Sequence, residues 1–163
     1  MSTLPSTIDD VQQLESLLSE PTDVVVRTLQ QVEGDLMVLG VAGKMGPTLA
    51  RMARRADPGR RIIGVSRFSD PAVEDQLRAH GIETIKGDLL EPSFLESLPD
   101  APNVITMAGL KFGTTGRESL AWAMNTVLPS LVCRRFRSSW DGGILHGGDL
   151  RDGPDRFRRL PGD

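Results

Sequence analysis

Tyrosine is absent from the sequence, cysteine occurs once, at Cys133, and no apolar run approaches the length of a membrane span. A single cysteine excludes an intrachain disulfide, and we expect a reducing, cytoplasmic environment. A transmembrane helix needs about 20 apolar residues in a row, so no membrane partner is expected. Positive charge is in deficit, since the net charge is −3 and the pI is near 5.4. A nucleic acid is therefore not an expected partner, because it binds basic surfaces.

Metal-ligating side chains are too few and too far apart to form a site. The sequence has two histidines, His80 and His146, and one cysteine, and their positions match none of the ligand spacings typical of zinc sites. We therefore expect no bound metal. The chain does have enough length, at 163 residues, for one domain with a single hydrophobic core.

From Leu36 onward, short apolar runs alternate with amphipathic segments. The runs "LMVLG", "RIIGVS", "IETIKG" and "NVITMAG" predict strands, and helices are predicted over residues 44–56, 70–81, 91–98 and 117–136. Buried strands that alternate with helices are typical of a parallel sheet with crossover helices. We predict an α/β fold with a Rossmann-like parallel sheet and flanking helices, truncated after about four strands.

Three regions follow from this reading. Residues 1–33 form an N-terminal helical extension, with a first helix over 7–20 capped by Ser6 or Thr7, and with residues 22–32 ambiguous between helix and strand. Residues 34–138 form the incomplete Rossmann-like domain. Residues 139–163 are rich in glycine, arginine and aspartate without a period, and we expect an irregular, disordered tail with no core-forming element.

The stretch "GVAGKMG" places Gly40, Gly43 and Gly46 between a predicted strand and a predicted helix. In dinucleotide-binding loops of this kind, one glycine permits a tight turn, one lets the backbone approach the pyrophosphate, and one lets helix and strand pack closely. The free N–H groups of the helix then face the phosphates. The expected cofactor contacts of this loop include Ala42, Lys44 and Met45 as well as the glycines. A glycine-rich turn without a ligand is the alternative.

The end of the second predicted strand bears on the choice of cofactor. Ser66 and Arg67 stand about 20 residues after the glycine loop, where NAD sites usually place an acidic residue and NADP sites an arginine. Arg67 can pair with a 2′-phosphate and Ser66 can add a hydrogen bond, so NADP is favoured over NAD. A solvated surface arginine is the alternative, and Asp70 keeps NAD open.

Two further strand ends complete the expected cofactor site. Asp88 follows the third strand in "KGDLLEP", with Leu89 beside it, and its carboxylate can accept a hydrogen bond from an adenine amino group. A turn or helix cap would use the same residue. The small residues Ala108 and Gly109 end the fourth strand and leave room for a cofactor, and Lys111 follows them.

In their order, "GVAGKMG", "GVSR", "KGDL", "MAG" and "MNT" resemble the extended short-chain dehydrogenases/reductases, the NAD-dependent epimerase/dehydratase family, over residues 35–138. The resemblance implies that the glycine motif binds the dinucleotide, that Asp88 contacts adenine, and that Ala108 and Gly109 line the cofactor. It also implies that Asn125 supports a proton relay by holding a water, and that the parent substrate is a sugar or nucleotide sugar.

Asn125 also stands four residues before Pro129, which has no N–H. The carbonyl of Asn125 therefore loses its helical partner, and we expect a kink at this point. A freed carbonyl can bind water, as the relay requires. A kink that serves packing alone is equally consistent with the sequence.

The family's catalytic set is missing from this chain. The resemblance calls for a serine or threonine after strand five and for a Tyr-x-x-x-Lys, in which tyrosine is the general acid/base, but the sequence has no tyrosine. We therefore expect a dinucleotide-binding half without catalysis. The alternatives are a non-catalytic NADP-sensing or interaction module and a nonfunctional truncated product. We also expect self-association through an exposed sheet edge.

The tail offers one explanation for the missing set. Codons permitted for "WDGGILHGGDLRDG", read one base later, encode "GTAAFSMGEIYGM", which resembles the family's fifth strand with its serine and tyrosine. A frameshift near Ser139 is therefore a hypothesis for residues 139–163, and a natural alternative C-terminus remains the other.

Overall fold

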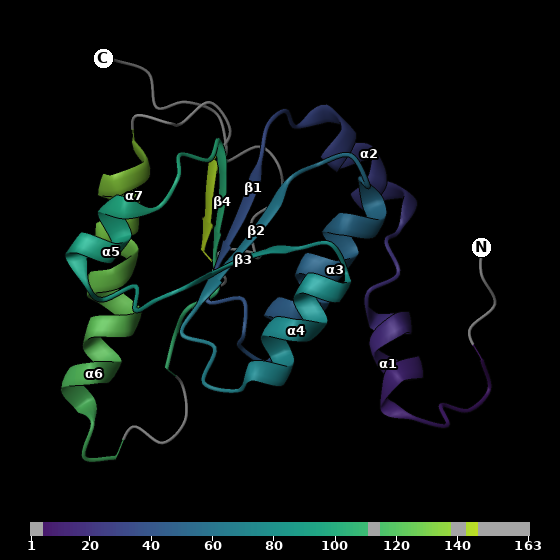
Figure 1. Cartoon of the computed structure of the whole chain (residues 1–163), viewed down its shortest axis with the longest axis horizontal. Coiled ribbons are helices and arrows are strands. Elements are labelled where there is room, and N and C mark those ends of the chain that lie inside the picture. The colour runs from purple at the N-terminus through teal and green to yellow at the C-terminus, as the bar shows by residue number, and fades with distance from the viewer. Residues whose placement is uncertain (1–4, 111–114, 138–142, 147–163) are drawn as a thin grey trace.

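The computed structural model describes residues 5–110, 115–137 and 143–146, and within them a parallel sheet is flanked by helices on both faces (Figure 1). The sheet order is β3-β2-β1-β4-β5, and every pairing is parallel. None of the described helices has the length and hydrophobicity of a membrane span. The elements in chain order are α1 (Val11–Leu18), α2 (Asp23–Gln31), β1 (Leu36–Leu39), α3 (Gly46–Ala56), β2 (Ile62–Ser66), α4 (Pro71–Ala79), β3 (Glu83–Lys86), α5 (Pro92–Ser97), β4 (Asn103–Thr106), α6 (Glu118–Trp122), the π-helical segment η1 (Ala123–Val127), α7 (Leu128–Phe136) and β5 (Gly143–His146).

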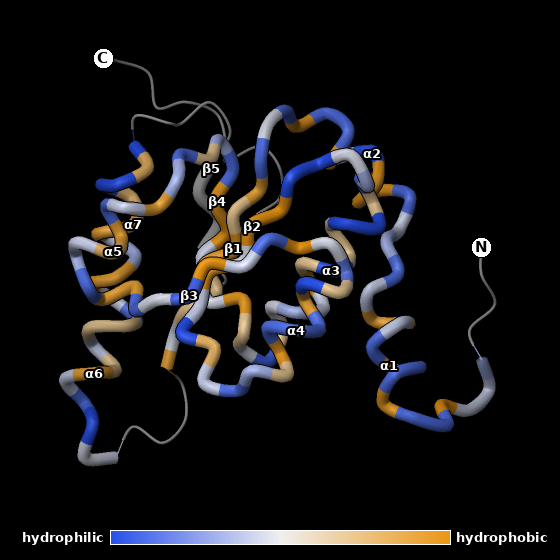
Figure 2. Tube along the Cα trace, viewed as in Figure 1, coloured by the Kyte–Doolittle hydropathy of each residue, from blue (hydrophilic) through white to orange (hydrophobic). Residues whose placement is uncertain are grey.

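Two hydrophobic cores lie on opposite faces of the sheet, and β1 contributes side chains to both of them. Met37 and Leu39 belong to the core under α5 and α7, whereas Leu36 and Val38 belong to the core under α3 and α4. This division follows from the strand period of two, which sends successive side chains to opposite faces. Hydrophobic residues accordingly concentrate along the central strands (Figure 2). The predicted α/β fold with a parallel sheet and flanking helices is confirmed.

The N-terminal extension packs outside α3 rather than on the sheet (Figure 1). The ambiguous segment 22–32 contains α2, and the hydroxyl of Thr22 caps it by accepting from the N–H of Val25. The predicted cap of the first helix, Ser6 or Thr7, is wrong. Asp10 caps α1 instead, since its carboxylate accepts from the N–H of Gln13 at 2.7 Å.

The predicted helix over 117–136 is interrupted. Its middle turn is η1, a π-helical segment that contains Asn125 and ends two residues before Pro129. The kink expected at Asn125 stays a prediction. A π turn takes in an extra residue, which rotates the inward face. Val127 is accordingly 49% exposed, whereas Leu128, the next residue, is fully buried.

A fifth short strand, β5, lies within residues 139–163, the segment for which the sequence predicts an irregular tail. Its backbone pairs in parallel with β4, with Gly143 opposite Asn103 and His146 opposite Thr106. The four residues are too few to show a strand pattern in the sequence, and the strand exists through its pairing with β4. The outer side of β4 is therefore covered, contrary to the exposed edge expected there, and β3 and β5 are the outer strands of the described sheet.

Candidate functional site

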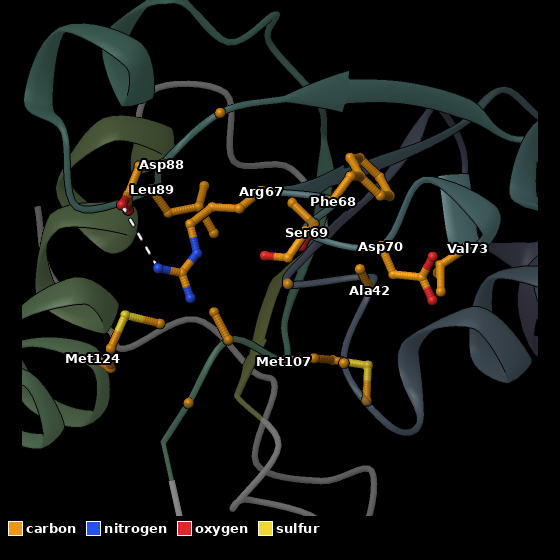
Figure 3. A pocket seen from close by; sticks show the side chains of 16 residues that line it. Ala42, Arg67, Phe68, Ser69, Asp70, Val73, Asp88, Leu89, Met107 and Met124 are labelled. Atoms are coloured by element: carbon orange, nitrogen blue, oxygen red, sulfur yellow. Dashed lines mark ion pairs between the residues drawn. The ribbon is translucent and has the colours of Figure 1, made fainter. Parts of the chain in front are cut away.

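A cavity of about 320 Å³ lies at the carboxyl ends of β1, β2 and β4 (Figure 3). The strands are parallel, so these ends meet at one edge, and the strand order reverses direction between β1 and β4. Such a reversal opens a crevice between neighbouring strand ends, where open α/β sheets bind ligands. The lining residues are Gly40, Ala42, Gly43, Ser66, Arg67, Phe68, Ser69, Asp70, Val73, Gly87, Asp88, Leu89, Met107, Ala108, Gly109 and Met124.

Two of the three loop glycines are required by the fold itself. Gly40 has a φ of 83°, and a Cβ there would lie 2.5 Å from the backbone nitrogen of Ala108. A Cβ on Gly46 would lie 2.1 Å from the carbonyl oxygen of Val41. Gly40 therefore permits the turn and the close approach of β4, and Gly46 permits α3 to pack on the loop, as predicted.

Gly43 differs from both, because it has space beside it. A Cβ there would meet one atom within 4 Å, the Gly40 carbonyl oxygen at 3.3 Å, and Gly43 lines the cavity. Packing therefore restricts a side chain at Gly43 much less than at Gly40 or Gly46, and the bare backbone of Gly43 is open to the cavity. A dinucleotide pyrophosphate needs this kind of backbone surface, so the loop fits the cofactor that the sequence predicts.

Arg67 and Asp88 lie at the ends of the adjacent strands β2 and β3 and face each other across part of the cavity (Figure 3). Their nearest charged atoms, Nη1 of Arg67 and Oδ2 of Asp88, are 4.0 Å apart. The other carboxylate oxygen of Asp88 accepts from the N–H of Leu90 at 3.0 Å. Asp88 therefore has the turn role that the sequence left open, and its second oxygen faces the cavity.

The small pair after β4 is held by Asn125. The side-chain oxygen of Asn125 accepts from the N–H of Leu110, and its amide nitrogen donates to the carbonyl of Leu110, both at 2.8 Å. A Cβ on Gly109 would lie 3.1 Å from the same Asn125 oxygen. Asn125 thus fixes the chain just after Ala108 and Gly109, and its role in a proton relay stays a prediction.

Most predicted cofactor contacts lie together in the cavity wall. These are Gly40, Ala42, Gly43, Ser66, Arg67, Asp88, Leu89, Ala108 and Gly109. Lys44, Met45 and Gly46 lie outside the lining, and the Met45 side chain is 64% exposed. Lys111 lies outside the described residues.

The sequence reading missed several lining residues. Met107, just after β4, and Met124, in η1, contribute apolar surface, and Phe68 follows Arg67 in the chain. Phe68 has a φ of 45° with its ring almost fully buried, which is rare for a bulky side chain. Three missed lining residues stand in quoted motifs and so had a signal in the sequence: Gly87 in "KGDL", Met107 in "MAG" and Met124 in "MNT".

Metal-ligating groups do not gather in the described residues. His80 follows α4, outside the cavity, and burial is the main cause that lowers its pKa, with the charge of Arg51 acting in the same direction. It therefore favours the neutral form, whereas a simple contact with the helix end would favour the charged form.

No family model matches the sequence, and no curated protein matches it. Solved structures do match the fold. A short-chain dehydrogenase/reductase from Saccharomyces cerevisiae matches with a TM-score of 0.58 at 14% sequence identity. The match covers 70% of this chain and 53% of the yeast protein. This match shows that the chain has a Rossmann-like α/β fold similar to that of this enzyme.

Other structures with this fold resemble the chain to a similar degree. The Bordetella bronchiseptica enzyme WbmG, in complex with NAD and UDP, matches at 18% identity with a TM-score of 0.54. UDP-glucose 4-epimerase from Brucella ovis, in complex with NAD, matches at 18% identity with a TM-score of 0.52. They cover 66% and 70% of this chain, but only 35% of each matched structure. The chain therefore spans about a third to a half of the dehydrogenase/reductase structures that it matches.

Proposed function

We propose that this chain is a nicotinamide-dinucleotide-binding unit, the cofactor-holding half of an epimerase/dehydratase- or reductase-like enzyme. The observation that carries the proposal is Gly43, a cavity-lining glycine at which an added Cβ would contact a single atom, the Gly40 carbonyl oxygen at 3.3 Å. The complexes of WbmG and of the Brucella epimerase with NAD support it, because they share the fold.

The chemistry of the wall divides the proposed site into three parts. The glycine loop would hold the pyrophosphate through backbone N–H groups. Ser66, Arg67 and Asp88, at the ends of β2 and β3, would hold the adenosine part. The small and apolar surface of Ala108, Gly109 and Met124 would accommodate the nicotinamide end and keep water from it.

Catalysis is not part of the proposal for this chain. A bound nicotinamide supplies hydride transfer, but the proton must be moved by a protein group, and the sequence has no tyrosine to do so. The UDP in the WbmG complex and the UDP-glucose epimerase activity named for the Brucella protein support a sugar or nucleotide sugar as the parent substrate.

Binding by the purified chain tests the proposal directly. NADPH fluorescence and isothermal titration calorimetry should show saturable binding at one site, with no turnover of the coenzyme. If neither NADPH nor NADH binds to the folded protein, the proposal is wrong.

We further propose that NADP is favoured over NAD, through Arg67. Its side chain is 64% exposed at the cavity, so its guanidinium is free to reach a 2′-phosphate. Arg67→Ala should weaken NADPH binding by about 1.5–3 kcal/mol, the range for a lost hydrogen bond to a charged group, and NADH binding far less. Arg27→Ala, which removes an exposed arginine from α2, is the control and should change neither affinity. Equal losses for both coenzymes in Arg67→Ala would show that the arginine does not bind the phosphate.

A further inference from the structure

Arg67 does not stand alone at the adenosine end of the cavity. The carboxylate of Asp88 lies 4.0 Å from its guanidinium, on the neighbouring strand end, and the two side chains point toward each other (Figure 3). Asp70 also lines the cavity, but it lies on the other side of Ser69, away from this pair (Figure 3). The positive group that would receive a 2′-phosphate is therefore paired with a negative one.

The backbone fixes this juxtaposition. Ser66 lies in register with Lys86, so the two parallel strands end side by side. The N–H of Gly87 donates to the carbonyl of Ser66 at 3.0 Å. This hydrogen bond continues the pairing of the two strands by one residue past the end of β3. The bond from Leu90 to Oδ1 of Asp88 then holds the carboxylate, with Oδ2 turned to Arg67.

A 2′-phosphate and a 2′-hydroxyl would meet this pair differently. A phosphate monoester carries a charge of about −1.5 to −2 at neutral pH, so it must compete with the carboxylate for Arg67. A ribose hydroxyl is neutral, and it can donate a hydrogen bond to the same carboxylate. Asp88 therefore acts against NADP and in favour of NAD, opposite to Arg67.

Resting on the proposed function, the geometry points to Asp88 as a second specificity-determining residue, which limits the preference for NADP by competing for Arg67. The preference of this site is thus set by a pair of residues on adjacent strands, and not by the arginine alone.

Asp88→Asn tests the inference with little structural disturbance. An asparagine oxygen still accepts from the N–H of Leu90, so the turn is retained while the charge is lost. We expect the ratio of the NADH to the NADPH dissociation constant to rise about two- to fivefold, the range for an exposed ion pair of 0.5–1 kcal/mol. Glu91→Gln is the matched control. It removes one charge three residues away, outside the cavity lining, and should leave the ratio unchanged.

Asp88→Asn combined with Arg67→Ala tests whether Asp88 acts on coenzyme preference through Arg67. If Asp88 acts through Arg67, Asp88→Asn should change the ratio less in the Arg67→Ala background than in the unmodified chain. An equal change in both backgrounds would show direct repulsion of the phosphate and would overturn competition for Arg67.

These binding measurements distinguish a failure of the inference about Asp88 from a failure of the proposed function. If the unmodified chain binds neither coenzyme, the proposed function fails. If it binds them, and Asp88→Asn leaves the ratio unchanged or weakens both coenzymes equally, the inference about Asp88 is wrong and the proposed function stands.

Discussion

At the scale of single residues, Gly43 is the position where binding and folding separate most cleanly. A side chain there would meet one backbone oxygen at 3.3 Å and would otherwise enter the cavity. Gly43→Val should therefore abolish dinucleotide binding, because it fills the space needed by the pyrophosphate. It should lower the unfolding temperature less than Gly46→Ala, because only one backbone oxygen has to give way. Calorimetric titration and thermal unfolding of the same preparation measure both effects.

Two glycine controls make this prediction specific. Gly59→Ala, on the surface with its nearest neighbour atom 3.7 Å away, should affect neither binding nor stability. Gly46→Ala should lower stability, because its Cβ would collide with the backbone of Val41. Unchanged affinity in Gly43→Val would remove the loop from the binding site.

Residue types at the strand ends could be predicted from the sequence because they belong to a motif with fixed spacing. Gly40, Arg67 and Asp88 are of this kind. Their relations could not be predicted, since the distance between Arg67 and Asp88 depends on the register of β2 and β3. The same holds for Phe68, whose left-handed backbone has no signal in a residue type that usually avoids it.

At the scale of elements, one buried arginine joins the end of α2 to the turn that precedes β2. The Arg60 side chain is 7% exposed, and its guanidinium donates to the carbonyls of Leu29, Val32 and Gly34 at the end of α2. It also pairs with Asp57 at 3.1 Å. The last carbonyls of α2 thus have partners that the helix itself cannot supply.

Arg60→Met keeps the apolar stem but removes this cap. We expect the free energy of unfolding to fall by about 1.5–3 kcal/mol, because the partly buried carbonyls of Leu29 and Val32 and the carboxylate of Asp57 lose a charged partner. Urea denaturation measures the change. Arg27→Met, at an exposed position of α2, should stay within about 0.5 kcal/mol of the unmodified chain, and an equally small loss in Arg60→Met would contradict the role of Arg60.

The elements with a strong period were predictable, and those that depend on their neighbours were not. Alternation of strands and helices predicted the sheet, and the kink expected from Pro129 stays a prediction. The π turn of η1, with Val127 exposed and Leu128 buried beside it, is decided by packing against the core. β5 depends on β4 for all its described hydrogen-bonded pairing, so four residues alone did not predict it.

At the scale of the whole molecule, much apolar surface remains without cover in the described residues. The exposed large apolar side chains of α1 include Val11 and Leu18, at 69% and 54%, and Trp122 of α6 is 69% exposed. The outer strands β3 and β5 each have one neighbour in the described sheet. Exposed apolar faces and open strand edges both favour association.

We therefore predict that the purified chain self-associates. Sedimentation velocity should show an average mass that rises with protein concentration, and the unfolding midpoint should rise with it, because association stabilises the folded form by mass action. Trp122→Glu should reduce association if the face of α6 takes part, whereas Gln30→Glu, the same charge on exposed α2, should have little effect. If association persists in Trp122→Glu, it proceeds through the strand edges or the face of α1. A monomer with a sharp, concentration-independent transition would show instead that these surfaces tolerate water, and the prediction would be wrong.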